Sequence, residues 1–211
     1  MISVNELLLF AGTCFLMVIT PGPNMIYLIS RSICQGRKAG VISLLGVICG
    51  FFVHLLAAAL GLTALFLAVP FAYEALKWAG AAYLLWLAWN AVKPGAKSAF
   101  EAKALAHDSA PKLFLMGFMT NLLNPKVAVF YLSIFPQFIV AQRGSIFTQV
   151  ITLGVTQISV SFSVNLLITI FAGSMAVWFT KNPQWLAVQR YVMGFVLAAL
   201  AVRLAVEQRR V

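Results

Sequence analysis

Two proline-containing breaks inside long apolar segments limit the folding of this chain more than any other feature. The first is Thr20-Pro21-Gly22-Pro23-Asn24 and the second is Asn124-Pro125-Lys126. Proline removes a backbone hydrogen-bond donor and clashes with the carbonyl four residues earlier. Because lipid offers no water to a freed carbonyl, a broken helix at membrane depth persists only where protein or a water-filled cavity satisfies it.

The composition indicates that the apolar segments cross a membrane. Of the 211 residues, 62% are hydrophobic and 9% are charged, and the mean hydropathy is +0.95. Soluble domains carry about 25% charged residues, so this chain could not cover itself with a soluble surface. We therefore expect an all-α integral membrane protein. At about 20 residues per span, its length accommodates about six transmembrane helices with short loops.

The positions of the charged residues predict where these six helices lie. We expect them at residues 7–30, 39–69, 75–92, 113–140, 144–180 and 185–206. The proline breaks interrupt the first and the fourth helix. In the sixth, Arg190 and Arg203 have to snorkel to an interface or face protein. The polar segment 93–112 is expected to be a cytoplasmic linker between a first half, 1–92, and a second half, 113–211.

The two halves align without a gap at an offset of 104 residues. Proline, tyrosine and glycine coincide at this offset: Pro21 with Pro125, Tyr27 with Tyr131, Gly40 with Gly144, and Gly50 with Gly154. The coincidence favours two related halves of three helices each. An odd number of spans per half makes the halves insert in opposite senses, which gives an inverted repeat. Paired interruptions in such repeats point to the binding site of a transporter.

The net charge of +10 comes from 15 basic and 5 acidic residues. A basic chain can bind nucleic acid, but here the basic residues punctuate the apolar runs instead of clustering on one element, so no nucleic-acid partner is expected. Charges placed in this way orient helices in a membrane. They concentrate after the first, third and fifth expected helices, which puts both termini outside the cytoplasm, although Arg209-Arg210 argues the other way.

Lys126 is the one ionisable residue besides histidine that lies well inside an expected span. A charge at this depth costs at least about 2.5–3.5 kcal/mol on insertion scales. Lys126 could bind a substrate carboxylate or exchange protons, or it could snorkel to an interface or bond freed carbonyls. Asn24 and Asn124 can donate and accept at once, so they could bond either freed backbone or a zwitterionic ligand.

A proton or substrate path is a second expectation. His54 lies in the middle of the second helix, where it could relay protons or stay neutral and bond a neighbouring helix. The fifth helix carries a polar series that includes Thr156, Gln157, Ser159 and Asn165. A 4-3-4 spacing puts four of its residues on one face, which we expect to line a cavity or a close helix contact: Thr152, Thr156, Ser159 and Ser163.

Motifs of other function classes are absent from the sequence. There is no HExxH, GxSxG or Walker loop and no pair of intramembrane aspartates, so a protease, an ATP-driven pump or a metal transporter is not expected. We expect no enzyme activity, no cofactor and no metal site. The cysteines, Cys14, Cys34 and Cys49, form no CxxC motif and are interpreted as small buried hydrophobes.

The two proline motifs resemble those of the LysE/RhtB family of amino-acid exporters, and the length and the linker also match. The resemblance implies a multi-pass protein of the bacterial cytoplasmic (inner) membrane that exports amino acids, driven by the proton gradient or the membrane potential. Its partners would be an amino acid, protons, membrane lipids and, in one arrangement, a second copy of the chain as a homodimer. The residues that would shape the transport site are Pro21, Gly22, Pro23, Asn24, Asn124, Pro125 and Lys126.

Members of this family that handle lysine often carry an acidic residue in the second helix. This chain has His54 in that helix, which favours a neutral substrate such as threonine, homoserine or leucine. The alternative is a membrane carrier of thiols or reducing equivalents from the wider superfamily, which would need paired cysteines on facing helices. A membrane scaffold without transport is a third interpretation, and it leaves Lys126 unexplained.

Overall fold

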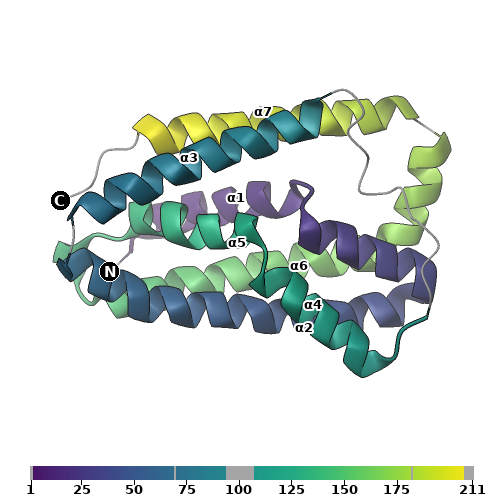
Figure 1. The fold of residues 1–211 in the computed structure, drawn as a ribbon, viewed down its shortest axis with the longest axis horizontal. Coiled ribbons are helices and arrows are strands. Elements are labelled where there is room, and N and C mark those ends of the chain that lie inside the picture. Colours follow the sequence, from purple (N-terminus) through teal and green to yellow (C-terminus); the bar gives the residue numbers. More distant parts are fainter. Residues whose placement is uncertain (1, 69, 94–106, 182, 207–211) are drawn as a thin grey trace.

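The structure is a computed structural model that describes residues 2–68, 70–93, 107–181 and 183–206, and within these ranges the chain is helical without a β-strand. Most helices lie along one long axis (Figure 1). The α-helices are α1 (Val4–Ile19), α2 (Pro23–Ala68), α3 (Pro70–Val92), α4 (Ala110–Leu122), α5 (Pro125–Val129), α6 (Ile146–Lys181) and α7 (Pro183–Val206). Three short segments lie between α5 and α6: η1 (Phe130–Ile134), η2 (Phe135–Phe138) and η3 (Ala141–Arg143).

Both proline motifs end a helix and start the next one. α1 ends at Ile19 and α2 starts at Pro23, while α4 ends at Leu122 and the chain bends by 45° before it continues from Pro125. Proline suits the first turn of a helix because the N–H that it lacks would have no partner there. The side chain of Asn124 caps α5 by accepting a hydrogen bond from the backbone N–H of Lys126 at 3.0 Å.

A glycine with positive φ follows each break. Gly36 (φ 83°) interrupts α2 and Gly144 (φ 116°) precedes α6, and no other described residue has positive φ in this structure. Glycine adopts this conformation readily because it has no Cβ. The sequence predicted a short polar turn between the first two helices. The structure has this turn at Gly36, where the two helical parts of α2 fold back on each other. The hydroxyl of Ser43, after the turn, donates to that of Tyr27, before it, at 3.1 Å.

The helix bounds differ from the expected ones at several ends. α3 begins at Pro70, five residues earlier than expected, and α4 begins at Ala110, inside the expected linker. Pro111 favours this early start because proline fits the first turn of α4. The rest of the expected linker, 94–106, lies outside the described residues, as do the side chains of Arg190 and Arg203.

Two described helices are long and apolar enough to cross a membrane: Pro23–Gly61 within α2 and Ile146–Met175 within α6. The bent pair Ala110–Leu122 and Pro125–Phe138 gives a third span if both parts count as one. Length and composition of the described helices thus support two or three spans, whereas the sequence predicted six. α1 is too short to count as a span by itself, because the first break limits it to 16 residues.

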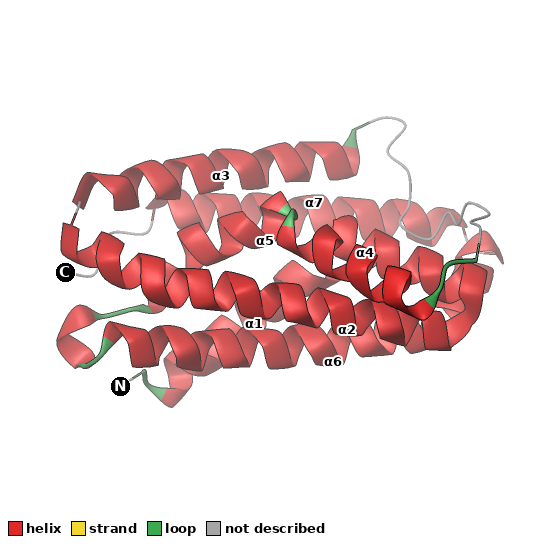
Figure 2. Ribbon diagram, turned by 60° about the horizontal axis from the view of Figure 1, so that its bottom comes forward, coloured by secondary structure: helices red, strands yellow, loops and turns green. Residues whose placement is uncertain are grey.

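The packing of the helices places α2 at the centre of the contacts. α2 packs against α4 and α6, α1 packs against α6, and α3 packs against α7. Figures 1 and 2 both show α3 and α7 side by side along one edge. A Cβ at Gly46 of α2 would meet the carbonyl oxygen of Phe114, and a Cβ at Gly117 of α4 would meet that of Ser43. Small residues let membrane helices approach to backbone contact, and α2 and α4 do so.

Candidate functional site

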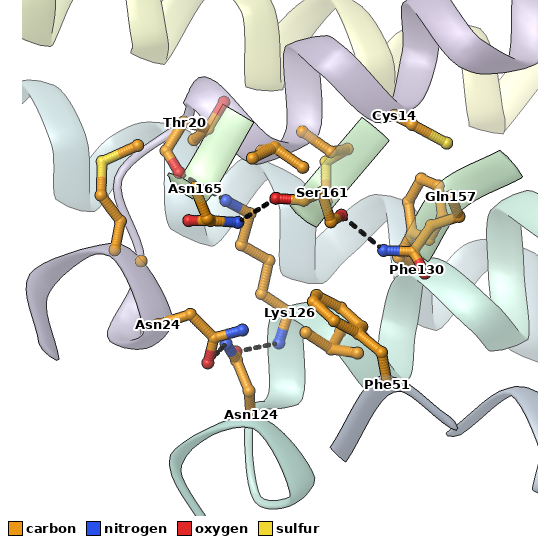
Figure 3. Close-up of a pocket in the computed structure, with 15 residues that line it drawn as sticks. Cys14, Thr20, Asn24, Phe51, Asn124, Lys126, Phe130, Gln157, Ser161 and Asn165 are labelled. Carbon is orange, nitrogen blue, oxygen red and sulfur yellow. Dashed lines mark hydrogen bonds between the residues drawn. The ribbon is translucent and has the colours of Figure 1, made fainter. Parts of the chain in front are cut away.

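The two proline breaks contact each other directly. The ammonium of Lys126 donates a hydrogen bond to the carbonyl oxygen of Thr20 at 2.6 Å, and the amide nitrogen of Asn124 donates to Oδ1 of Asn24 at 3.0 Å. Figure 3 shows these side chains converging from both breaks. All four residues are buried. The motifs that lie far apart in the sequence therefore form one polar group, which we call the break cluster: Thr20, Asn24, Asn124 and Lys126.

Lys126 satisfies a backbone group that the first break leaves free. Thr20 is the C-cap of α1, so its carbonyl has no partner within that helix. The structure thus gives Lys126 one of its expected roles, that of bonding a freed carbonyl. An ammonium has three hydrogens, and one of them bonds Thr20. The other two have no hydrogen-bond partner among the described residues. Lys126 therefore keeps the capacity to bind a ligand.

Gly22 leaves room for the lysine stem. A Cβ at position 22 would lie 3.2 Å from Cδ and 3.5 Å from Nζ of Lys126. The first distance is tighter than ordinary contact between carbon atoms, so a larger residue would have to displace the lysine. The glycine of the first motif therefore has a packing role at the break cluster.

A cavity with about 490 Å³ of empty space, partly open to the surroundings, lies beside the break cluster. Its polar side consists of the break cluster, Gly22 and three residues of α6: Gln157, Ser161 and Asn165. Its apolar side consists of Cys14, Met17, Val18, Met25, Phe51, Val127 and Phe130. Among these lining residues Lys126 alone carries a charge. Ligand pockets typically combine apolar walls with a few polar groups in this way.

The structure brings together only part of the residue set expected from the sequence. The cavity is lined by Gly22, Asn24, Asn124, Lys126, Gln157 and Asn165. The prolines of the two motifs set the helix ends around it without lining it: Pro21, Pro23 and Pro125. Three residues of the expected path are not part of its lining: His54, Thr156 and Ser159.

The polar face expected on α6 is turned away from the cavity. Thr152, Ser159 and Ser163 are exposed, so this face neither lines a cavity nor makes a close helix contact in the described part of the chain. The prediction failed because these hydroxyls are satisfied within their own helix. Thr152 and Ser163 each donate to the carbonyl four residues earlier at 2.9 Å. The buried face of α6 instead carries Gln157, Ser161 and Asn165, which follow one another at intervals of four residues.

His54 reaches the cavity only through a neighbour. Its Nε2 is 3.2 Å from the carbonyl oxygen of Asn121 on α4, and a carbonyl can only accept, so Nε2 donates. The ring stacks on Tyr131 with 5.7 Å between centroids. The Tyr131 hydroxyl donates to Oε1 of Gln157 at 2.6 Å. This arrangement matches the expectation of a histidine that bonds a neighbouring helix.

Several lining residues were not anticipated from the sequence. Ser161 could have been found, because it lies four residues from both Gln157 and Asn165 and so shares their helix face. The apolar lining residues, such as Met17 and Phe51, carry no such signal. In a chain that is 62% hydrophobic, residue type does not separate a cavity wall from a packed core or a lipid-facing surface.

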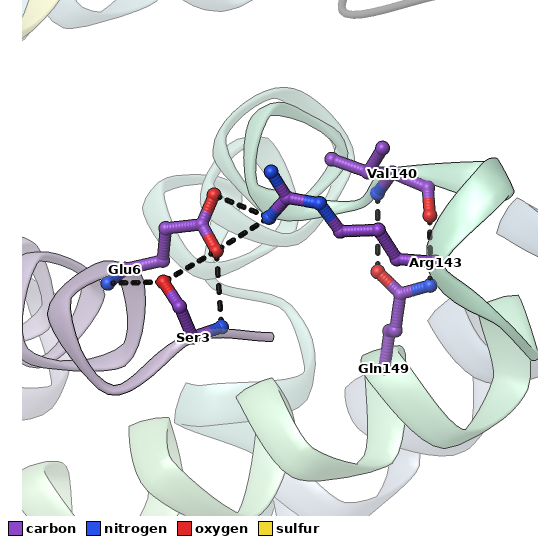
Figure 4. Close-up of polar contacts among 5 residues, drawn as sticks. All are labelled: Ser3, Glu6, Val140, Arg143 and Gln149. Carbon is purple, nitrogen blue, oxygen red and sulfur yellow. Dashed lines mark hydrogen bonds and ion pairs between the residues drawn. The ribbon is translucent and has the colours of Figure 1, made fainter. Parts of the chain in front are cut away.

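Ion pairs lie at both ends of the molecule. Glu6, near the start of α1, binds Arg143 at 2.7 Å (Figure 4). Asp108, just before α4, binds Arg31 at 2.6 Å and Lys112 at 2.6 Å. Figure 1 shows that α1 and α4 start at opposite ends of the bundle. We call Glu6–Arg143 and Arg31–Asp108 the end ion pairs, and neither was predicted from the sequence.

Both acids of the end ion pairs are charged at neutral pH. Hydrogen bonds from the backbone and the side chain of Ser3, together with Arg143, lower the pKa of the Glu6 carboxyl to about 2. Ser3 and Glu6 also form a capping box at the start of α1. A hydrogen bond from Lys112 is the main cause that lowers the pKa of the Asp108 carboxyl below its ordinary value.

Metal and thiol chemistry find little support in the described residues. No group of three or more His, Cys, Asp or Glu side chains among them could hold a metal ion. Cys14 is buried and lines the cavity, Cys34 is half-buried and Cys49 is exposed, and none of the three forms a disulfide. Only Cys14 therefore fits the expected role of a small buried hydrophobe.

Comparison with known proteins gives the family of this chain. The family model described as LysE type translocator matches residues 15–208. The chain is 34% identical over 197 residues to the homoserine/homoserine lactone efflux protein of Salmonella typhimurium (strain LT2), covering 92% of each chain. It is 29% identical over 192 residues to the leucine efflux protein of Enterobacter sp. (strain 638), covering 90% of each, and 29% identical over 214 residues to a Bacillus subtilis (strain 168) protein named as a membrane protein.

The chain therefore belongs to the LysE type translocator family, as its two proline motifs suggested. Together with the long apolar helices, the relatives indicate a multi-pass membrane protein. No solved structure matches the chain.

Proposed function

We propose that this protein is a secondary transporter that exports a neutral amino acid from the cytoplasm across the bacterial inner membrane. The observation that carries the proposal is the cavity beside the break cluster, where the buried ammonium of Lys126 stands among amide groups and apolar walls. Family membership and the amino-acid efflux named for two relatives support it. The proposed driving force is the proton gradient or the membrane potential.

The groups around the cavity favour a substrate with an uncharged side chain. The substrate carboxylate binds the Lys126 ammonium, since charge-assisted hydrogen bonds are the strong ones. The apolar wall, which includes Met17, Met25 and Phe51, accommodates an aliphatic side chain. A cationic side chain would meet no acid among the lining residues, and burying an unpaired charge is costly.

The proposed architecture has six spans in two inverted halves. The order of the described elements supports it, because each half has a short helix, a proline break, a positive-φ glycine, a long helix and a helix that begins with proline. The final helices of the two halves are α3, which starts at Pro70, and α7, which starts at Pro183. α1 and α4 run in opposite directions along the bundle (Figure 1), as inverted halves require.

Alternating access needs a closure on each side of the site, and the end ion pairs provide one at each end. Glu6, at the start of the first half, binds Arg143, which comes just before Gly144 in the second half. Asp108, before the start of the second half, binds Arg31, which comes before Gly36 in the first half. Gln149 of α6 also holds the segment before Gly144 through two hydrogen bonds to its backbone, at 3.0 and 3.1 Å. Both pairs are formed here, and export proceeds by breaking one at a time.

Substrate binding acts on this movement through Lys126. The substrate carboxylate and the Thr20 carbonyl compete for the same ammonium, and the carboxylate is the stronger acceptor. When the carboxylate is bound, the hydrogen bond between the end of α1 and the start of α5 weakens. The two breaks are then freer to move relative to each other, so an occupied site changes conformation more readily than an empty one.

A metabolite efflux screen tests the proposal. Cells that overproduce the protein are compared with cells that overproduce Lys126→Ala, and excreted amino acids and the amount of membrane-inserted protein are quantified. We expect the wild type to excrete one or more neutral amino acids and the variant to remain at background. Equal excretion by the variant at equal membrane level would rule out the site. The absence of any excess excretion by the wild type would rule out the function.

A further inference from the structure

The α6 side of the cavity carries an unused hydrogen-bond acceptor. Asn165 is buried, and its amide nitrogen donates to the carbonyl oxygen of Ser161 at 2.8 Å. Because a carbonyl can only accept, the amide nitrogen must face Ser161 and the amide oxygen must face away. Among the described residues, this oxygen has no hydrogen-bond partner, and Asn165 lines the cavity. This oxygen is not fully enclosed, so it can accept a hydrogen bond from a ligand in the cavity.

The other amide oxygens around the cavity are already occupied. The oxygen of Asn24 accepts from Asn124, and that of Asn124 accepts from the backbone N–H of Lys126. The oxygen of Gln157 accepts from the Tyr131 hydroxyl. Of the four side-chain amides in the lining, Asn165 alone has an oxygen that accepts no hydrogen bond within the described part of the chain.

The hydrogen bond from its own amide nitrogen to the Ser161 carbonyl keeps this acceptor from turning away, and Ser161 is held in turn by a neighbour. The amide nitrogen of Gln157 donates to Oγ of Ser161 at 2.7 Å, one helical turn before Asn165. Tyr131, which is 2% exposed, fixes the Gln157 amide by its own hydrogen bond at 2.6 Å. A flip of the Asn165 amide would place two carbonyl oxygens against each other. The orientation of the acceptor is therefore set before any ligand arrives.

We infer that Asn165 accepts a hydrogen bond from the α-ammonium group of the substrate while Lys126 binds its carboxylate. The inference rests on the proposed function and adds the residue that recognises the amino group. In Figure 3 the ammonium of Lys126 and the amide of Asn165 lie in the same part of the cavity, next to Thr20. An α-amino acid carries both its charged groups on one carbon, so the two subsites have to be neighbours.

Two compounds separate the subsites. Homoserine lactone keeps the α-ammonium group but has no free carboxylate, so it can contact Asn165 and has little to offer Lys126. The compound 4-hydroxybutyrate keeps the carboxylate and the hydroxyl but lacks the ammonium group. Together with L-homoserine, they form a set in which each charged group is removed in turn.

The test measures binding of these three probes by calorimetry to the purified full-length wild type, Asn165→Leu and Lys126→Met. We expect Asn165→Leu to weaken binding of L-homoserine and of the lactone by about tenfold or more, the cost of losing a hydrogen bond to a charged group. Its binding of 4-hydroxybutyrate should stay as in the wild type. Lys126→Met should weaken binding of L-homoserine and 4-hydroxybutyrate by a larger factor than binding of the lactone.

Control variants separate a lost contact from a lost fold. Thr156→Val lies on the same helix but outside the lining, and it should bind every probe as the wild type does. If Asn165→Leu does not fold, the smaller substitution Asn165→Ala removes the same acceptor and should weaken binding of the lactone by a similar factor. Unchanged binding of the lactone by folded Asn165→Ala would overturn the inference.

The outcomes also distinguish the inference from the proposed function. Unchanged binding of L-homoserine and the lactone by folded Asn165→Leu would overturn the ammonium subsite and leave the proposed function standing. If the wild type binds none of the probes and excretes no amino acid in the efflux screen, the proposed function itself fails, and the subsite fails with it.

Discussion

Lys126 and Thr20 are 106 residues apart in the sequence, yet the ammonium of one lies 2.6 Å from the carbonyl oxygen of the other. The contact joins the start of α5 to the end of α1 and so ties one proline break to the other. It depends on Gly22, which leaves space for the lysine stem. One buried residue thus holds the broken helices together and also presents two further hydrogens to the cavity.

The Glu6–Arg143 pair makes the stability of the protein sensitive to acid. The pKa of Glu6 is lowered to about 2 in the folded state, against about 4.3 in an unfolded chain. The stabilisation is therefore complete above pH 4.3 and is lost as the pH falls toward 2. We expect Glu6→Gln to lower the thermal unfolding midpoint at pH 7 and to lose less stability on acidification than the wild type.

The effect of Glu6→Gln should be modest, because Arg143 is 45% exposed at the pair. Exposed ion pairs contribute about 0.2–1 kcal/mol after solvent screening. Unfolding midpoints of the detergent-solubilised protein between pH 7 and 3 provide the measurement. Parallel acid sensitivity of wild type and variant would show that the pair does not contribute in this way.

The end ion pairs should control opposite ends of the molecule independently. Asp108→Asn removes the carboxylate that joins Arg31 to Lys112, so we expect amide hydrogen exchange to accelerate at the start of α4. Arg143→Gln should accelerate exchange at the start of α1 instead. Hydrogen exchange read by mass spectrometry compares the two variants. Acceleration of both ends by either variant, or of neither, would contradict a separate closure at each end.

The contact of α2 with α4 should not tolerate a side chain at Gly46. A Cβ there would overlap the carbonyl oxygen of Phe114 and lie 2.8 Å from the backbone nitrogen of Phe118, so backbone would have to move. Overpacking of this kind costs about 1–3 kcal/mol. We expect Gly46→Ala to lower the unfolding midpoint. Gly12→Ala is the matched control, because nothing lies within 4 Å of its Cβ position, and it should be neutral or stabilising.

A cysteine-free variant tests the alternative of a thiol carrier. Such a carrier passes reducing equivalents between paired cysteines, but Cys14 is the only cysteine in the lining of the cavity. We expect the combined substitution of Cys14, Cys34 and Cys49 by alanine to keep amino-acid efflux near the wild-type level. Complete loss of efflux from a variant that inserts normally would favour the thiol carrier.

The features that sequence reasoning located correctly are those set by local chemistry. Pro21, Pro23 and Pro125 cannot continue a helix, so the positions of both breaks follow from residue type alone. The role of Lys126 at the breaks follows from the cost of burying a charge beside freed carbonyls. Family membership followed from the same motifs and is confirmed by the family model.

The features that it missed depend on which helix faces which. The 4-3-4 series on α6 correctly placed its residues on one helix face. It did not show whether this face points inward or outward, because hydroxyls that bond their own helix can face outward. The Glu6–Arg143 pair joins residues 137 apart, and no local rule selects that partner.

The central claim is that the Lys126 ammonium binds the carboxylate of the transported amino acid, and exchange in proteoliposomes tests it most directly. Vesicles loaded with unlabelled L-homoserine or L-leucine and containing the purified wild type should take up the labelled amino acid, while vesicles with folded Lys126→Met should show only background uptake. Uptake by Lys126→Met at the wild-type rate, with equal amounts of folded protein in the vesicles, would contradict the account.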